Sequence, residues 1–185
     1  MPHLQTKLAP TPRQNLLLAA LPEKDYKRLE SCLELVPLPQ GWTVYENGGQ
    51  LGLVYFPTTS TISLLSVGAK GDPEKIALIG NDGVFGISML MGRKITPARA
   101  IVQTAGYSYR LQASSLMREF ELGSPLRYLL QRYTQSLATR MAQAAIPAVQ
   151  AAHSALRAPA MPLAAPAVIS SSGAGSAVAS AVAST

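Results

Sequence analysis

Residues 54–86 read "VYFPTTSTISLLSVGAKGDPEKIALIGNDGVFG" and contain three short runs of branched and aromatic residues. The runs are followed by "PTT", "GAKGDP" and "NDG", whose proline, glycine, asparagine and aspartate residues favour turns. Short strands at such close intervals are typical of an all-β sandwich or small barrel. The pattern extends in both directions and predicts strands at residues 33–38, 43–46, 51–56, 61–67, 74–80, 99–105 and 107–112.

Helical patterns flank this block of strands on both sides. Residues 13–33 predict two short helices, the first capped by Asn15, and residues 113–123 predict another. The predicted fold class is therefore mainly β with flanking helices. The sequence divides into a flexible arm (1–12), a β domain (13–123), a long helix (124–146) and a tail (147–185) rich in alanine, serine and proline, which we expect to be disordered.

The long helix carries a stripe of mostly apolar residues at helical spacing. The stripe comprises Leu126, Leu130, Tyr133, Leu137, Met141 and Ala144, at intervals of four, three, four, four and three residues. A seam of about three heptads favours self-association, so we expect a homodimer through residues 124–146. The alternative is that the same stripe packs on the chain's own strands.

The composition excludes several classes of function. Cys32 is the only cysteine, and His3 and His153 are the only histidines. One chain therefore cannot form an internal disulfide, a Cys/His zinc site or a four-cysteine iron–sulfur cluster, and we expect no metal, no catalytic residues and no enzyme. The net charge of +6 comes from scattered basic residues without a long basic run. No signal peptide or membrane span is recognisable, so we expect a cytoplasmic protein without membrane contact.

Six segments follow one another in a recognisable order. They are "NLLLAALP", "LPQGWTVYENG", "VYFPTTSTISLLS", "ALIGNDGVFGISMLMG", "ARAIVQTAGYSYRL" and "SPLRYLLQRYTQSLATRMAQAA", and they cover roughly residues 14–145. Together they resemble the sensor half of the Crp/Fnr family of bacterial transcription regulators. The resemblance implies a cyclic-nucleotide-binding-type β-roll, jelly-roll-like in its strand arrangement, followed by a long helix that forms the homodimer. It also implies a helix-turn-helix domain that reads DNA.

The glycine-rich corner after residue 79 is the counterpart of that family's phosphate-binding cassette. The candidate ligand-binding residues are Gly83, Val84, Gly86, Arg99 and Ala100. In members that respond to cyclic nucleotides, a glutamate beside the glycine accepts from the ribose hydroxyl and an arginine holds the phosphate. Here Val84 can accept nothing, Pro97 stands at the arginine position, and Arg99 is a displaced substitute. We therefore expect no cofactor and no tight binding of a cyclic nucleotide.

The family pattern stops near Ala145. Residues 146–185 contain one arginine and no lysine, so they cannot contact several phosphates. DNA is the partner that the resemblance implies, but we expect this chain alone not to bind DNA sequence-specifically. A frameshifted or truncated gene and a genuine short regulator both stay open. The sequence predicts the sensor and dimerisation module of a Crp/Fnr-like regulator; the alternative is a stand-alone ligand-binding or dimer-poisoning protein that acts on full-length relatives.

Overall fold

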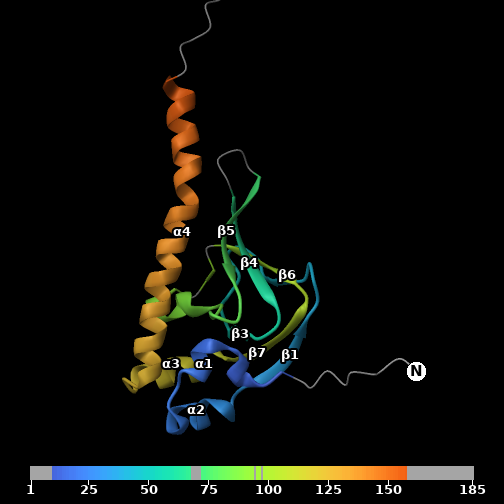
Figure 1. Cartoon of the computed structure of the whole chain (residues 1–185), viewed down its shortest axis with the longest axis vertical. Coiled ribbons are helices and arrows are strands. Elements are labelled where there is room, and N and C mark those ends of the chain that lie inside the picture. The colour runs from blue at the N-terminus through green and yellow to red at the C-terminus, as the bar shows by residue number, and fades with distance from the viewer. Residues whose placement is uncertain (1–9, 68–71, 94, 97, 158–185) are drawn as a thin grey trace, which may run out of the picture.

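The computed structural model describes residues 10–67, 72–93, 95–96 and 98–157. In this part of the chain the strands form two antiparallel sheets, which together make up a β-roll (Figure 1). One sheet has the order β1 (Glu34–Leu38), β7 (Gly106–Gln112), β3 (Leu53–Pro57); the other has the order β2 (Thr43–Tyr45), β6 (Arg99–Thr104), β4 (Thr61–Val67), β5 (Pro73–Ile79). Every strand predicted from the sequence is confirmed, with bounds that differ by one or two residues.

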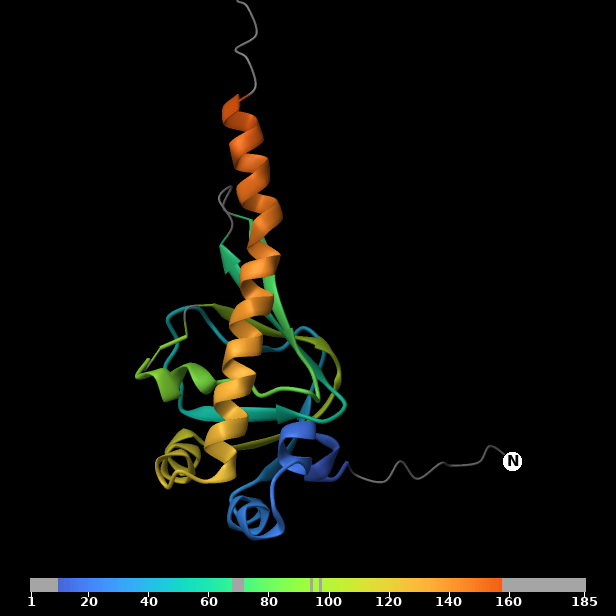
Figure 2. The same cartoon turned by 60° about the vertical axis from the view of Figure 1, so that its left-hand side comes forward.

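The helices lie at one end and along one side of this roll. The elements are η1 (Pro12–Gln14), α1 (Leu16–Ala19) and α2 (Glu23–Glu30) before the strands, η2 (Ile87–Met91) between β5 and β6, and α3 (Ala113–Glu121) and α4 (Pro125–Arg157) after them. Helices α1, α2 and α3 gather at the lower end of the roll in Figure 1. Helix α4 packs on α3 and β5 and continues past the sheets (Figures 1 and 2).

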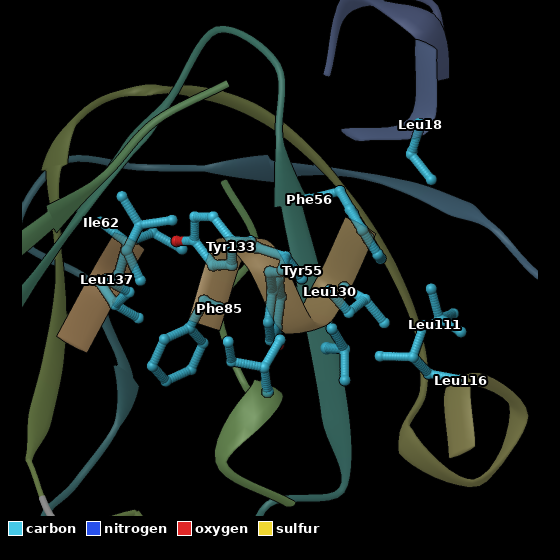
Figure 3. Packing of buried hydrophobic residues seen from close by; sticks show 14 of the residues in the cluster. Leu18, Tyr55, Phe56, Ile62, Phe85, Leu111, Leu116, Leu130, Tyr133 and Leu137 are labelled. Atoms are coloured by element: carbon cyan, nitrogen blue, oxygen red, sulfur yellow. The ribbon is translucent and has the colours of Figure 1, made fainter. Parts of the chain in front are cut away.

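The core lies between the two sheets and α4. Phe56 and Ile62 from the sheets and Leu130 from α4 have no more than about 1% of their surface exposed. Figure 3 shows Tyr133 and Leu137 of α4 pointing into the same cluster. Because a buried leucine or phenylalanine contributes roughly 1.5–3 kcal/mol, α4 is an integral part of the folded domain.

Asn15 joins the N-terminal helices to the roll. Its side-chain oxygen accepts hydrogen bonds from the backbone N–H groups of Leu17 and Leu18, at 3.1 and 3.4 Å, which confirms the predicted helix cap. Its Nδ2 donates to the carbonyl oxygens of Pro57, at 2.9 Å, and Gly83, at 2.8 Å. The side chain is fully buried, so one residue fixes α1 against the end of β3 and against the glycine-rich corner.

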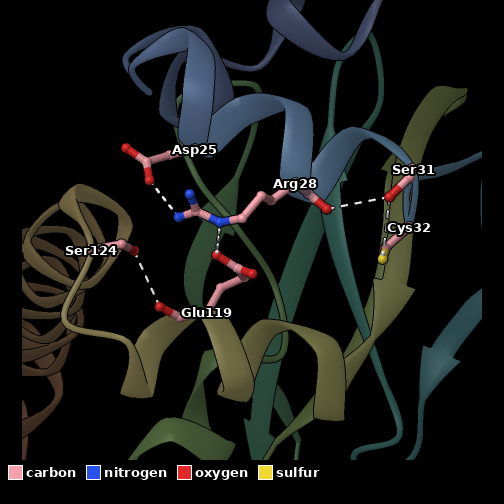
Figure 4. Close-up of polar contacts among 6 residues, drawn as sticks. All are labelled: Asp25, Arg28, Ser31, Cys32, Glu119 and Ser124. Carbon is pink, nitrogen blue, oxygen red and sulfur yellow. Dashed lines mark hydrogen bonds and ion pairs between the residues drawn. The ribbon is translucent and has the colours of Figure 1, made fainter.

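A partly buried ion pair connects α2 to α3. Arg28 Nε donates to Glu119 Oε2 at 2.9 Å, and the same guanidinium group pairs with Asp25 (Figure 4). Glu119 is buried, and the Ser124 hydroxyl donates to its backbone oxygen at 3.1 Å. Since Ser124 directly precedes α4, this network fixes the start of the long helix relative to the N-terminal helices.

The long helix ends later than the sequence predicts. It was expected over 124–146 with a disordered tail from 147, but α4 is helical to Arg157. The loss of apolar patterning after residue 146 therefore does not mark the end of the helix. Alanine has the highest helix propensity, and Pro147 removes only one backbone hydrogen bond from a helix that is already nucleated. Residues 1–9 of the predicted arm and 158–185 of the predicted tail lie outside the described residues.

Candidate functional site

The glycines of the corner between β5 and η2 make room for other parts of the same chain. Gly86 has a φ of 97°, and a Cβ atom there would lie 2.9 Å from the backbone oxygen of Leu53. A Cβ atom on Gly83 would lie 2.4 Å from the hydroxyl oxygen of Tyr133 on α4. Both positions require glycine for close packing. The corner is thus shaped to receive a strand and a helix.

The roll interior beside this corner is nearly filled. It encloses a cavity of about 60 Å³, whereas sites for small organic ligands usually measure about 300–1,000 Å³. Val84 and Phe85 from the corner and Leu137 and Met141 from α4 line it. No described residue that lines the cavity carries a charge. The space suits a few water molecules at most.

Arg99 does not reach this interior. Along β6 the side chains alternate, so Ala100 and Val102 are buried while Arg99 is exposed. Its guanidinium group pairs with Glu46 at 3.0 Å, and it donates to the Thr43 hydroxyl at 3.2 Å. The prediction that Arg99 substitutes for a phosphate-binding arginine is therefore wrong, because the strand period places it on the outer face.

The remaining candidate residues do come together. Val84 and Gly86 line the cavity, Gly83 abuts Tyr133, and Ala100 is fully buried on the adjacent strand. Sequence reasoning missed Leu137 and Met141 as lining residues, since it assigned them to a dimer seam. The alternative interpretation, that the apolar stripe packs on the chain's own strands, would have placed both residues in the roll interior.

That alternative is the one observed over most of the stripe. Leu126, Leu130, Tyr133 and Leu137 are each no more than 9% exposed in the single chain. Met141 is partly buried and Ala144 is exposed. The assignment of the four buried residues to a dimer seam is therefore wrong, because a side chain inside the core of one chain has no surface left for a partner.

Helix α4 is held on the corner by polar groups as well. Arg140 pairs with Asp82 at 3.4 Å, and its guanidinium carbon lies 5.8 Å from the ring centroid of Tyr133. The Tyr133 hydroxyl is buried and has no hydrogen-bond partner among the described residues. Burial raises the pKa of Tyr133 to about 12.

This pKa makes the folded state sensitive to alkaline pH. The folded protein holds the phenol proton of Tyr133 more tightly than the unfolded chain, whose tyrosines titrate near 10.0. The resulting stability is complete below pH 10 and is lost as the pH rises towards 12, by an amount on the order of 3 kcal/mol.

We expect the Tyr133→Phe variant to keep or exceed the wild-type stability at pH 7, because it removes an unpartnered hydroxyl. Its free energy of unfolding should decline less than that of the wild type between pH 9.5 and pH 11.5 (roughly the span over which a free tyrosine ionises). Urea unfolding followed by circular dichroism measures both. Equal declines in the two proteins would contradict the assignment to Tyr133.

Comparison with solved structures gives the fold a name. The N-terminal domain of a transcriptional regulator from Streptomyces coelicolor A3(2) is similar at 19% identity and a TM-score of 0.51, with 78% of this chain and 95% of that one covered. The sensor domain of the transcriptional regulator DNR from Pseudomonas aeruginosa is similar at 18% identity and a TM-score of 0.54, with 71% and 89% covered. The chain has the cyclic-nucleotide-binding fold.

This fold also occurs in kinase regulatory subunits. The regulatory domain of protein kinase A from Toxoplasma gondii, solved with cAMP, is similar at 15% identity and a TM-score of 0.55. The comparison covers 66% of this chain and 47% of that one, so the present chain spans less than half of that structure. The fold implied by the resemblance to Crp/Fnr regulators is thus confirmed.

Comparisons with protein-family models and with curated proteins find no match to this sequence. Among the described residues, no helix combines the length and the apolar composition needed to cross a bilayer.

Proposed function

We propose that the chain is the sensor and dimerisation module of a Crp/Fnr-like transcription regulator, and that its roll interior does not take a cyclic nucleotide. The proposal that no cyclic nucleotide binds rests on the filled interior, where Phe85, Leu137 and Met141 leave a cavity of only about 60 Å³. A cyclic nucleotide would have to displace these side chains from the core.

The electrostatics of the interior support the same proposal. A buried phosphate needs a cation or several donors, since an unpaired buried charge costs several kcal/mol. The described lining supplies no charge, and Arg99 is engaged with Glu46 on the outside. The side chain of Val84, fully buried, offers no acceptor to a ribose hydroxyl.

Titration calorimetry with cAMP and with cGMP tests this half of the proposal. We expect no saturable heat at ligand concentrations up to about 1 mM. A dissociation constant of about 1 mM corresponds to a binding free energy of only about 4 kcal/mol. Micromolar binding of either nucleotide would overturn the proposal. In that event the Arg99→Ala variant shows whether Arg99 takes part in binding. Unchanged nucleotide affinity is expected because Arg99 faces outwards. A large loss of affinity would show that β6 rearranges on binding.

The proposed dimer uses a different stripe of α4 from the one predicted. Five exposed residues recur at intervals of three, four, three and four: Tyr128, Gln131, Gln135, Ala138 and Ala142. Such spacing is that of a coiled-coil seam, and alanines allow two helices to approach closely. A groove of about 530 Å³ lies beside this stripe, lined in part by Met91 and Phe120. Exposed apolar surface next to an unpartnered helix face is typical of an interface.

Sedimentation velocity of the full chain tests the dimer. We expect the wild type to dimerise and the Ala138→Glu variant to do so at least about tenfold more weakly, because two introduced carboxylates meet across the seam. Ser136→Glu is the matched control, since Ser136 is exposed on the same helix but lies about 120° away from the stripe. Equal effects of the two variants, or a wild-type monomer at high concentration, would contradict the proposed interface.

A further inference from the structure

A further pocket, distinct from the corner cavity, lies beside η2. It has a volume of about 670 Å³ and is lined by Tyr45, Gln50, Leu51, Gly52, Leu53, Met89, Gly92, Arg93 and Met117. No residue is shared with the lining of the filled interior. Its volume lies within the range of small-molecule sites.

The walls of this pocket are fixed by backbone hydrogen bonds. The segment after β2 is tied to the segment after η2, because Gly48 N donates to Thr96 O at 2.9 Å and Thr96 N donates to Gly49 O at 3.0 Å. At the other end, Ala113 N at the start of α3 donates to Gly52 O at 3.0 Å. The Tyr45 hydroxyl accepts from the backbone N–H of Leu53 at 2.9 Å. The pocket is therefore framed by parts of the fold that hold each other in place.

The lining is largely apolar with one cation. Met89 and Leu53 pack against the core, and Met117 of α3 is half-buried beside them. Arg93 is exposed and forms no ion pair with any described residue, and no carboxylate is among the described lining residues. An open, largely apolar pocket with one guanidinium group that forms no ion pair among the described residues complements an apolar molecule that carries one anionic group.

We infer that this pocket binds a small apolar molecule carrying one carboxylate, whose charge pairs with Arg93 while its hydrocarbon part contacts Met89 and Met117. Methionine side chains adapt to irregular apolar ligands. The net charge of +6 favours the approach of an anion.

The pocket is connected to the core of the sensor domain by packed side chains. The Tyr45 ring, which lines the pocket, lies 5.6 Å from the ring of Phe85 between centroids. Phe85 in turn lines the interior cavity together with Leu137 of α4. A ligand in the pocket thus contacts a chain of packed side chains that leads to the long helix.

Titration calorimetry of the full chain with sodium decanoate tests the inference, with decanol as the uncharged comparison. We expect saturable one-to-one binding of decanoate, at least about tenfold tighter than that of decanol. The Arg93→Gln variant should weaken decanoate binding about tenfold and leave decanol binding unchanged. Met117→Trp, which fills the pocket, should abolish the binding of both.

Arg118→Gln is the matched control, because Arg118 is an exposed arginine on α3 that does not line the pocket. It should bind decanoate as the wild type does. Absence of saturable decanoate binding, equal affinity for decanol, or equal losses in the Arg93 and Arg118 variants would overturn the inference. Circular dichroism of each variant confirms that a loss of binding is not a loss of fold. None of these outcomes depends on whether the roll interior binds a cyclic nucleotide.

Discussion

Replacing Leu130 by alanine is expected to lower the free energy of unfolding by about 3 kcal/mol. The side chain is fully buried, and it lies among core residues of the roll in Figure 3. Its truncation removes buried apolar surface and leaves a cavity that neighbouring elements fill only in part. Urea unfolding, followed by circular dichroism at several protein concentrations, measures the change.

Tyr128→Ala is the matched control on the same helix. Tyr128 is 61% exposed, so its loss should change the unfolding free energy of the monomer by no more than about 0.5 kcal/mol. In the proposed dimer, the same variant should weaken association. The opposite pattern, with Leu130→Ala affecting only dimerisation, would mean that the predicted stripe faces a partner after all. Concentration series separate the two effects, because dimer stability depends on protein concentration and monomer stability does not.

Replacing Asn15 by alanine is expected to destabilise the fold by a comparable amount, again about 3 kcal/mol. The variant removes the N-cap of α1 and leaves the backbone oxygens of Pro57 and Gly83 without their donor. Each of these losses costs about 1 kcal/mol or more in a buried site. Thermal and urea unfolding at pH 7 measure the total.

The Asn15→Ser variant separates the two parts of this effect. A serine hydroxyl can still cap the helix but is too short to reach both carbonyl groups, so serine should cost about 1 kcal/mol less than alanine. Equal destabilisation by serine and alanine would assign the whole effect to the lost contacts with β3 and the corner. A loss below about 0.5 kcal/mol in both variants would contradict the role given to Asn15.

The candidate site was only partly predictable from the sequence. The glycines at 83 and 86 were found because a turn-rich corner follows a strand of recognisable period. The predicted position of Arg99 was wrong because the prediction used only its spacing from Pro97. It did not consider which adjacent residues of the strand would be buried. Ala100 and Val102 are buried, and the period of a strand therefore places Arg99 on the opposite, outer face. Pairing of Arg99 with Glu46 depends on strands that are far apart in the sequence.

The long helix shows the same limit. An apolar stripe specifies that one face of a helix is buried, but not what buries it. Here β5 and the corner around Gly83 cover the face that carries Tyr133 and Leu137. The stripe therefore belongs to the core of one chain. The helix face that stays exposed is the one with the weakest apolar pattern in the sequence.

The sequence by itself determined the seven strands and the cap at Asn15, because period, turn residues and capping are local properties. The cyclic-nucleotide-binding fold followed from the resemblance of six ordered segments to Crp/Fnr regulators. Tertiary structure alone decided that Arg99 faces outwards, that α4 fills the interior, and that a separate pocket opens at Arg93. These outcomes depend on which surfaces meet when distant segments pack. Strand register and the fit between side chains of distant segments decide that, and neither is encoded in any short stretch of the chain.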